Sequence, residues 1–392
     1  MKFNRLCAAF SLFVFCSCTS VKNIQKNTDD GDLDRYSKEI VSAIKGMTVR
    51  EKIGQMFCVV PENFDFNLSQ KQIDMDTVPS SCMVSAEMKK NFMQYPVGGI
   101  IYFRKNLESP EQIKKMMNDF DSVSKVPLIH STDEEGGRVA RVARVEKFET
   151  KKTGPALKVK DPEKMGNEIG TYLKKYGFNV DFAPVADVWT NPKNAVIGDR
   201  AFSTDPEEAG EKVAMAISGF HDAGVKVAIK HFPGHGDTKA DSHNGTAKSY
   251  KTWKKMKKCE MIPFKRGIES GADMVMVAHI KTPFASRDGL PASLSSTWIT
   301  ERLRGELGFD GVVITDAMGM KALSSSYTSL ESSLMAIEAG VDILLMPHDF
   351  TKTFDELVSA VESGKISESR IDESVARILK MKSGFKKIIK LA

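Results

Sequence analysis

Residues 161–182 read DPEKMGNEIGTYLKKYGFNVDF, and this stretch contains one complete helix-to-strand unit. Asp161-Pro162 is a typical helix start, because aspartate caps a helix N-terminus and proline suits the first turn. Apolar residues from Met165 to Tyr176 keep the 3.6-residue period of one helix face, and Gly177 is a typical helix end. The apolar, β-branched run at 178–182 then predicts a strand.

The same unit recurs along the chain. Asp205-Pro206 opens a second helix that ends at Gly224, and a strand is expected after it. Short apolar runs that predict strands stand at 53–60, 99–103, 126–131, 178–182, 225–230, 273–278, 311–315 and 342–346. Strands that alternate with helices favour a parallel sheet, and no G-x-G-x-x-G turn of an open dinucleotide fold follows the first strand. We therefore predict a single-domain α/β fold, a (β/α)8 TIM-type barrel over residues 36–390, with a partly helical insertion at 61–96.

Composition excludes several classes of protein. The chain has 392 residues, with 56 Lys+Arg against 51 Asp+Glu, and a formal net charge of +5. This small excess, without basic blocks interleaved with aromatic residues, disfavours nucleic acid as a partner. The cysteines of the body, Cys58, Cys82 and Cys259, form no CxxC pair, so neither a zinc knuckle nor a disulfide framework is indicated.

The N-terminus has the layout of a secretory signal. Lys2 and Arg5 precede an apolar stretch at 6–16, which is too short to span a bilayer. Cys18 follows the small Ser17 and resembles the lipid acceptor of a bacterial lipoprotein, although plain secretion with cleavage nearby is the alternative. We expect residues 1–17 to be a signal peptide, 18–35 a flexible tether, and the protein to be lipid-anchored at a membrane of the bacterial cell envelope.

Polar residues collect at the predicted C-terminal ends of the strands, where the loops of such a barrel form its active site. Asp133 follows the third strand, Lys230-His231 ends the fifth, His279 follows the sixth and Asp316 the seventh. The loop from residue 230 reads KHFPGHG and continues to Asp-Ser-His at 241–243. A metal site would be expected to draw ligands from several strands, including a His-x-His on the first. Because 53–60 contains no histidine, we predict no metal.

Acid/base chemistry is the other interpretation of this loop. In an extended segment Asp241 and His243 point the same way, so the carboxylate can hold the imidazole and raise its pKa, which suits a proton donor. The alternative is a surface turn. Asp316 could cap the next helix, or serve as the carboxylate that glycoside cleavage requires opposite a proton donor, about 5 Å away in retaining enzymes.

Four ordered motifs together resemble glycoside hydrolase family 3, in its bacterial β-N-acetylglucosaminidase branch. They are KHFPGHG with DSH at 230–243, D-x-E-G-G-R-V-x-R at 133–141, IGDR at 197–200 and ITD at 314–316. The resemblance implies that Asp316 is the nucleophile, His243 the acid/base and Asp241 its partner. It also implies, without a cofactor, that the sugar in the −1 subsite is held by Asp133, Arg141, Arg200, Lys230 and His231.

The resemblance also implies the reaction. We expect release of a terminal, non-reducing β-linked N-acetylglucosamine with retention of configuration, by a monomer that acts on muropeptides, other cell-wall fragments or chitin-type saccharides. The chain ends at Ala392 without room for the C-terminal αβα sandwich domain that supplies a glutamate acid in β-glucosidases of the family. The alternatives are a phosphorylase or a β-glucosidase of the same family, and a non-catalytic glycan-binding lipoprotein.

Overall fold

A computed structural model describes residues 33–75, 82–238, 245 and 247–385. Eight parallel strands form one sheet in the order β7-β6-β5-β4-β3-β2-β1-β8. The first and last strands of this order meet through a parallel bridge between Ile314 and Ile343, which closes the barrel. The strands are β1 Phe57–Val59, β2 Gly99–Ile101, β3 Ile129–Thr132, β4 Val180–Asp181, β5 Lys226–Phe232, β6 Met274–Val277, β7 Val312–Thr315 and β8 Leu344–Leu345. The predicted (β/α)8 barrel is confirmed, and the described residues contain no second domain.

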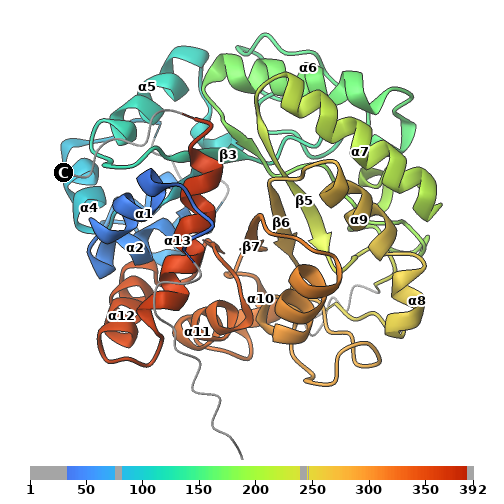
Figure 1. Ribbon diagram of the computed structural model, residues 1–392. Coiled ribbons are helices and arrows are strands. Elements are labelled where there is room, and N and C mark those ends of the chain that lie inside the picture. The colour runs from blue at the N-terminus through green and yellow to red at the C-terminus, as the bar shows by residue number, and fades with distance from the viewer. Residues whose placement is uncertain (1–32, 76–81, 239–244, 246, 386–392) are drawn as a thin grey trace, which may run out of the picture.

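Helices surround the barrel, as Figure 1 shows. The α-helices are α1 Lys38–Lys45, α2 Val49–Gln55, α3 Gln70–Ile73, α4 Ala86–Gln94, α5 Pro110–Asp121, α6 Pro162–Tyr176, α7 Pro206–Asp222, α8 Trp253–Lys257, α9 Met261–Glu269, α10 Lys321–Ser324, α11 Ser329–Ala339, α12 Phe350–Glu362 and α13 Glu368–Lys382. Short 3-10 segments lie at Pro61–Phe64, Arg104–Asn106, Ala156–Lys158, Gly198–Arg200 and Ala292–Leu294, and a π-helix at Thr297–Glu306. None of these described helices is long and apolar enough to cross a bilayer.

The helix predicted from residue 161 is confirmed with both of its ends. The Asp161 side chain accepts a hydrogen bond from the amide of Lys164, and Gly177 ends α6 in the left-handed conformation with φ of 102°. Helix α7 packs closely against α6 because glycine stands at the contact. A Cβ atom at Gly219 would lie 1.9 Å from the carbonyl oxygen of Glu163, so a larger side chain would push the two helices apart.

The predicted start of the first strand was wrong. The run 53–60 was assigned to the first strand, but Ile53 lies in α2 and only residues 57–59 form β1. Helix α2 begins with a capping box, in which the Thr48 side chain and Glu51 exchange hydrogen bonds. Short apolar runs are ambiguous between buried helix and strand, and the polar residues that cap this helix decide the outcome.

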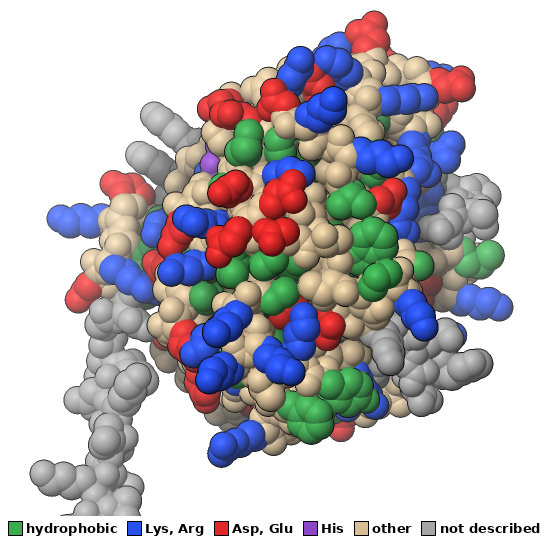
Figure 2. Space-filling model, turned by 90° about the vertical axis from the view of Figure 1, so that its right-hand side faces the viewer, with side chains coloured by type: hydrophobic (Ala, Val, Ile, Leu, Met, Phe, Trp, Pro, Cys, Tyr) green, Lys and Arg blue, Asp and Glu red, His purple; other side chains and the backbone are tan. Residues whose placement is uncertain are grey.

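The predicted insertion at 61–96 contains α3 and α4 in its described parts. The ring centroid of Phe64, in this segment, lies 5.2 to 5.9 Å from the ring centroids of Phe92, Phe120 and Phe350. The segment therefore belongs to the same hydrophobic core as the barrel helices. On the face that Figure 2 shows, acidic and basic side chains are interspersed, so that face carries no single-sign field. Residues 1–32, with the predicted signal peptide and Cys18, lie outside the described residues.

Candidate active site

Asp316 follows β7 directly and lies at the C-terminal end of the barrel, partly exposed. Its amide donates to the Val277 carbonyl at 2.9 Å, and its Oδ1 accepts from the Ala317 amide at 2.8 Å. Burial alone would raise the pKa of this carboxyl, but the His231 and His279 rings, the hydrogen bond from the Ala317 amide and the Lys230 ammonium outweigh it and hold the pKa below its ordinary value. Asp316 is therefore an anion at neutral pH.

His279 supports the turn that carries Asp316. Its Nε2 lies 3.1 Å from the Ala317 carbonyl oxygen and its Nδ1 lies 2.7 Å from the Ser293 hydroxyl. A carbonyl can only accept, so Nε2 carries the proton and Nδ1 accepts from Ser293. Burial lowers the pKa of His279, although Asp316 acts in the opposite direction, so the ring is neutral at pH 7. Sequence analysis noted this histidine after the sixth strand but gave it no role.

A buried ion cluster joins β5 to the loops that follow β3 and β4. The Lys230 ammonium, at the end of β5, lies 2.7 Å from Asp133 Oδ1 and 2.7 Å from Glu135 Oε1. Arg200 grips the same Glu135 carboxylate with two parallel bonds, both 2.7 Å long. Burial alone would raise the pKa of Glu135, but the Lys230 and Arg200 charges lower it to about 2. Glu135 thus anchors two of the predicted sugar-binding cations. Sequence reasoning missed it, although its place two residues after Asp133 was a signal.

A second buried carboxylate holds His231. Asp187 Oδ2 lies 2.7 Å from His231 Nδ1, and Asp187 Oδ1 accepts from the amide of His235. The Arg200 Nη2 lies 3.2 Å from His231 Nε2, and arginine can only donate, so Nε2 accepts and the proton on Nδ1 faces Asp187. Although burial acts to raise the pKa of Asp187, the two imidazoles lower it below its usual value. Asp187 was also missed, and its signal was a charge within the apolar run 182–188.

Arg141 lies at the rim of this cluster. Its side chain is 33% exposed, and its Nη2 lies 3.8 Å from Asp133 Oδ2. The guanidinium stands 5.4 Å from the centroid of the Phe103 ring. Its Nε has no hydrogen-bond partner among the described residues. Arg141 therefore keeps donor capacity that no described residue uses.

Most of the predicted site residues thus come together at one end of the barrel. Asp133, Arg141, Arg200, Lys230 and His231 form a connected network. Of that network, His231 and Lys230 are close enough to Asp316 to lower the pKa of its carboxyl. Asp241 and His243 lie outside the described residues, so the acid/base pair stays a prediction. Among the residues that the structure describes, no group of three His, Cys, Asp or Glu side chains is arranged to hold a metal ion.

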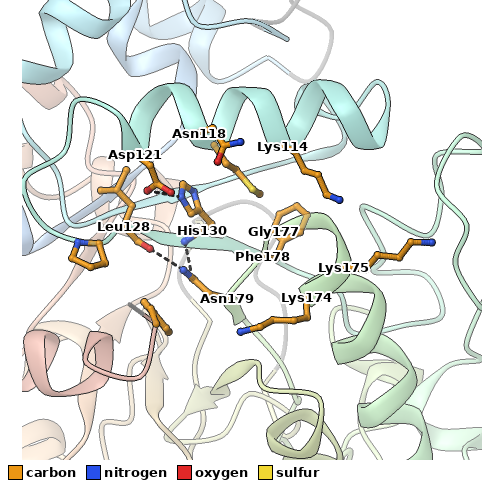
Figure 3. Close-up of a pocket in the computed structure, with 13 residues that line it drawn as sticks. Lys114, Asn118, Asp121, Leu128, His130, Lys174, Lys175, Gly177, Phe178 and Asn179 are labelled. Atoms are coloured by element: carbon orange, nitrogen blue, oxygen red, sulfur yellow. Dashed lines mark hydrogen bonds and ion pairs between the residues drawn. The ribbon is translucent and has the colours of Figure 1, made fainter. Parts of the chain in front are cut away.

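A hollow of about 350 Å³ lies at the opposite end of the barrel. Figure 3 shows it between α5 and the residues before β3 and β4, lined by Lys114, Asp121 and His130 among others. His130 has both ring nitrogens occupied, by Tyr102 and Asp121. Because catalytic residues of such barrels stand at the C-terminal ends of the strands, we assign the active site to the end that carries Asp316 and not to this hollow.

Comparisons with known proteins agree with the barrel fold described above. Residues 48–381 match the family model described as glycosyl hydrolase family 3 N terminal domain. The chain is 34% identical over 328 residues to beta-hexosaminidase A of Pseudoalteromonas piscicida, which covers 76% of this chain and 55% of that protein. It is 32% identical over 294 residues to a beta-hexosaminidase of Nitrosomonas eutropha, covering 71% and 83%. A solved family 3 beta-N-acetylglucosaminidase from Paenibacillus sp. superposes with a TM-score of 0.76 and 36% identity, covering 86% of this chain and 62% of that one.

Proposed function

The chain belongs to glycosyl hydrolase family 3, a family of glycosidases, and on this premise we propose that it releases terminal, non-reducing β-linked N-acetylglucosamine with retention of configuration. The observation that carries the proposal is the ionised, partly exposed Asp316 carboxylate at the same end of the barrel as the sugar-binding cluster. Two relatives bear the name beta-hexosaminidase, and the Paenibacillus structure is a beta-N-acetylglucosaminidase. These names support the choice of sugar.

In the proposed mechanism the −1 sugar lies over the buried ion cluster. Lys230, Arg200 and His231 form its floor, while Arg141 and Asp133 at the rim donate to and accept from its hydroxyl groups. Holding the ring in this way places the anomeric carbon against Asp316, so that part of the entropy cost of reaction is met on binding.

Asp316 then attacks the anomeric carbon while a proton passes to the departing oxygen. We assign that proton to His243, with Asp241 as the carboxylate that keeps its imidazole basic enough to be charged. Water next attacks the glycosyl-enzyme from the face that the leaving group has vacated, with His243 as base, so the product has the β configuration.

Product stereochemistry tests the proposal. Proton NMR during turnover of an aryl β-N-acetylglucosaminide should show the β-anomer first, followed by mutarotation. Asp316→Ala should lose more than about 1,000-fold in kcat, as expected for a covalent nucleophile. Asp222→Asn, an exposed carboxylate of α7, is the matched control and should retain full activity. First appearance of the α-anomer, or equal turnover by Asp316→Ala, would exclude the mechanism.

The same assay separates the alternative functions. Added phosphate that yields the sugar 1-phosphate identifies a phosphorylase, and faster turnover of the aryl β-glucoside identifies a β-glucosidase. No turnover of any glycoside by wild type, with retained saccharide binding, identifies the glycan-binding lipoprotein.

We also propose an envelope location with a lipid anchor on Cys18, and a monomer that acts on muropeptides, related cell-wall fragments or chitooligosaccharides. The basis is the signal-like N-terminal sequence and the compartment that it implies. Cys18→Ala should move the protein from the membrane fraction to the soluble fraction of cells. Unchanged membrane association would reject the anchor.

A further inference from the structure

The Glu134 side chain is fully buried, and its chain neighbours Asp133 and Glu135 belong to the ion cluster of the candidate site. Its Oε2 accepts from the amides of Arg141 and Val142, at 2.6 and 2.8 Å. Its Oε1 accepts from the amide of Ala143 at 3.0 Å and from the Tyr172 hydroxyl at 2.8 Å. One side chain therefore satisfies three consecutive backbone donors and one phenol, which is the full acceptor capacity of a carboxylate.

Glu134 also sits between the two carboxylates that hold Lys230. Its own amide donates to Asp181 Oδ1 at 2.9 Å, which fixes the start of the loop after β3. Asp133 and Glu135, on either side, both contact the Lys230 ammonium at 2.7 Å. Glu134 thus ties the beginning of this loop to its return at residues 141–143.

The segment between these two ends is held separately. The Arg138 guanidinium bonds the Asp199 carboxylate and the carbonyl oxygens of residues 195–197, and the Gly137 amide donates to the Thr153 carbonyl at 3.1 Å, but none of these contacts involves the Arg141 side chain. The Arg141 side chain is weakly held, since its nearest anion is 3.8 Å away and its Nε lacks a partner among the described residues. Its position is therefore decided by its backbone, and the backbone is held by Glu134.

We propose that Glu134 and Tyr172 are positioning residues for substrate binding, which set the place of the Arg141 guanidinium by holding the amides of residues 141–143. A carboxylate suits this role because it only accepts, whereas a glutamine would turn an NH2 group toward backbone N–H donors. The Tyr172 hydroxyl fixes the carboxylate from α6, so the barrel helix and the sugar-binding loop are joined through one buried group.

The test is Tyr172→Phe, which removes one hydroxyl and keeps the ring. The inference rests on the proposed function, so turnover of an aryl β-N-acetylglucosaminide by wild type is established first. Tyr172→Phe should then raise KM about 5- to 20-fold and change kcat much less, because a hydrogen bond to a charged group is lost and Arg141 is displaced. Glu134→Gln should act in the same direction and more strongly.

Tyr176→Phe is the matched control. Tyr176 lies on the same helix, and its hydroxyl donates to the Glu149 carbonyl oxygen at 3.0 Å, outside the site. It should lower the melting temperature about as much as Tyr172→Phe and leave KM unchanged. If Tyr172→Phe lowers the melting temperature without moving KM, Glu134 and Tyr172 are structural only and the inference is overturned.

A double-mutant cycle with Arg141→Ala identifies the residue through which Tyr172 acts. In the Arg141→Ala background, Tyr172→Phe should leave KM unchanged, because the positioned group is gone. The same increase in both backgrounds would contradict the proposed route. A wild type that turns over no glycoside overturns the proposed function instead, and the Kd for N-acetylglucosamine, measured by calorimetry on the same four proteins, then replaces KM with the same expected pattern.

Discussion

The Glu135→Gln variant probes the anion that pairs with Lys230 and Arg200, two of the cations that we propose hold the sugar. In the folded protein Lys230 and Arg200 hold the pKa of Glu135 at about 2, against 4.5 for an ordinary glutamate. This difference corresponds to about 3 kcal/mol of folding free energy at neutral pH, and the side chain is only 4% exposed, so solvent screening is weak. Glutamine keeps the size of the side chain and loses the charge, which leaves Arg200 and Lys230 incompletely paired.

Loss of the Glu135 charge should lower both the stability and the activity of the variant. A change of about 3 kcal/mol corresponds to a lowering of the melting temperature by about 5 °C, and to roughly 100-fold in kcat/KM if the two cations lose their places by the same free energy. Glu149→Gln removes an exposed ion pair to Lys175 and is the control, with an expected change below about 1 °C.

The contribution of Glu135 to stability should depend on pH. Because the folded pKa of Glu135 is depressed, its stabilisation is complete above the unfolded value near 4.5 and disappears as pH falls toward 2. Wild type and Glu135→Gln should therefore converge in stability over that interval, as measured by denaturant unfolding. Equal melting temperatures and equal kcat/KM at pH 7 would refute the reasoning.

Three further predictions concern other buried groups. Burial lowers the pKa of Lys382 to about 7, while the unfolded side chain keeps its proton up to about pH 10.5. The free energy of unfolding of wild type, measured in urea, should therefore rise by about 4 kcal/mol relative to that of Lys382→Met between pH 7 and 10. A difference between the two proteins that does not change with pH would contradict the lowered pKa. Asp187→Asn removes the charged partner of His231 Nδ1 and should lower kcat/KM about 10- to 100-fold on an aryl β-N-acetylglucosaminide, with unchanged kinetics as the contrary result. Ser293→Ala removes the donor that fixes the His279 tautomer and should lower kcat about fivefold. An unchanged kcat would show that the turn at Asp316 keeps its geometry without this hydrogen bond.

The barrel could be predicted from the sequence because local signals repeat in it. The caps of α6 and the left-handed Gly177 are set by residues within one turn of the helix end, so periodicity and caps suffice there. The misassigned boundary at Ile53 shows the limit of this approach. A short apolar run such as 53–60 fits a buried helix and a buried strand equally well.

The candidate site was predicted less completely. Asp133, Lys230 and Asp316 stand at strand ends, which the fold alone marks as active-site positions. Glu135 and Asp187 were given no role because their roles depend on partners far away in sequence. Asp187 meets His231 across 44 residues and Glu135 meets Arg200 across 65, and no periodicity encodes such pairings.

Trapping the covalent intermediate tests the central claim most directly. With a 5-fluoro-N-acetylglucosaminyl fluoride the glycosyl-enzyme should accumulate, because the ring fluorine slows both steps by destabilising their oxocarbenium-like transition states, while the good fluoride leaving group speeds only the first step. Mass spectrometry of the digested, labelled protein should then find the sugar on the peptide that contains Asp316, and Asp316→Ala should take up no label. Label on another carboxylate, or turnover of the probe without any covalent adduct, would contradict the account.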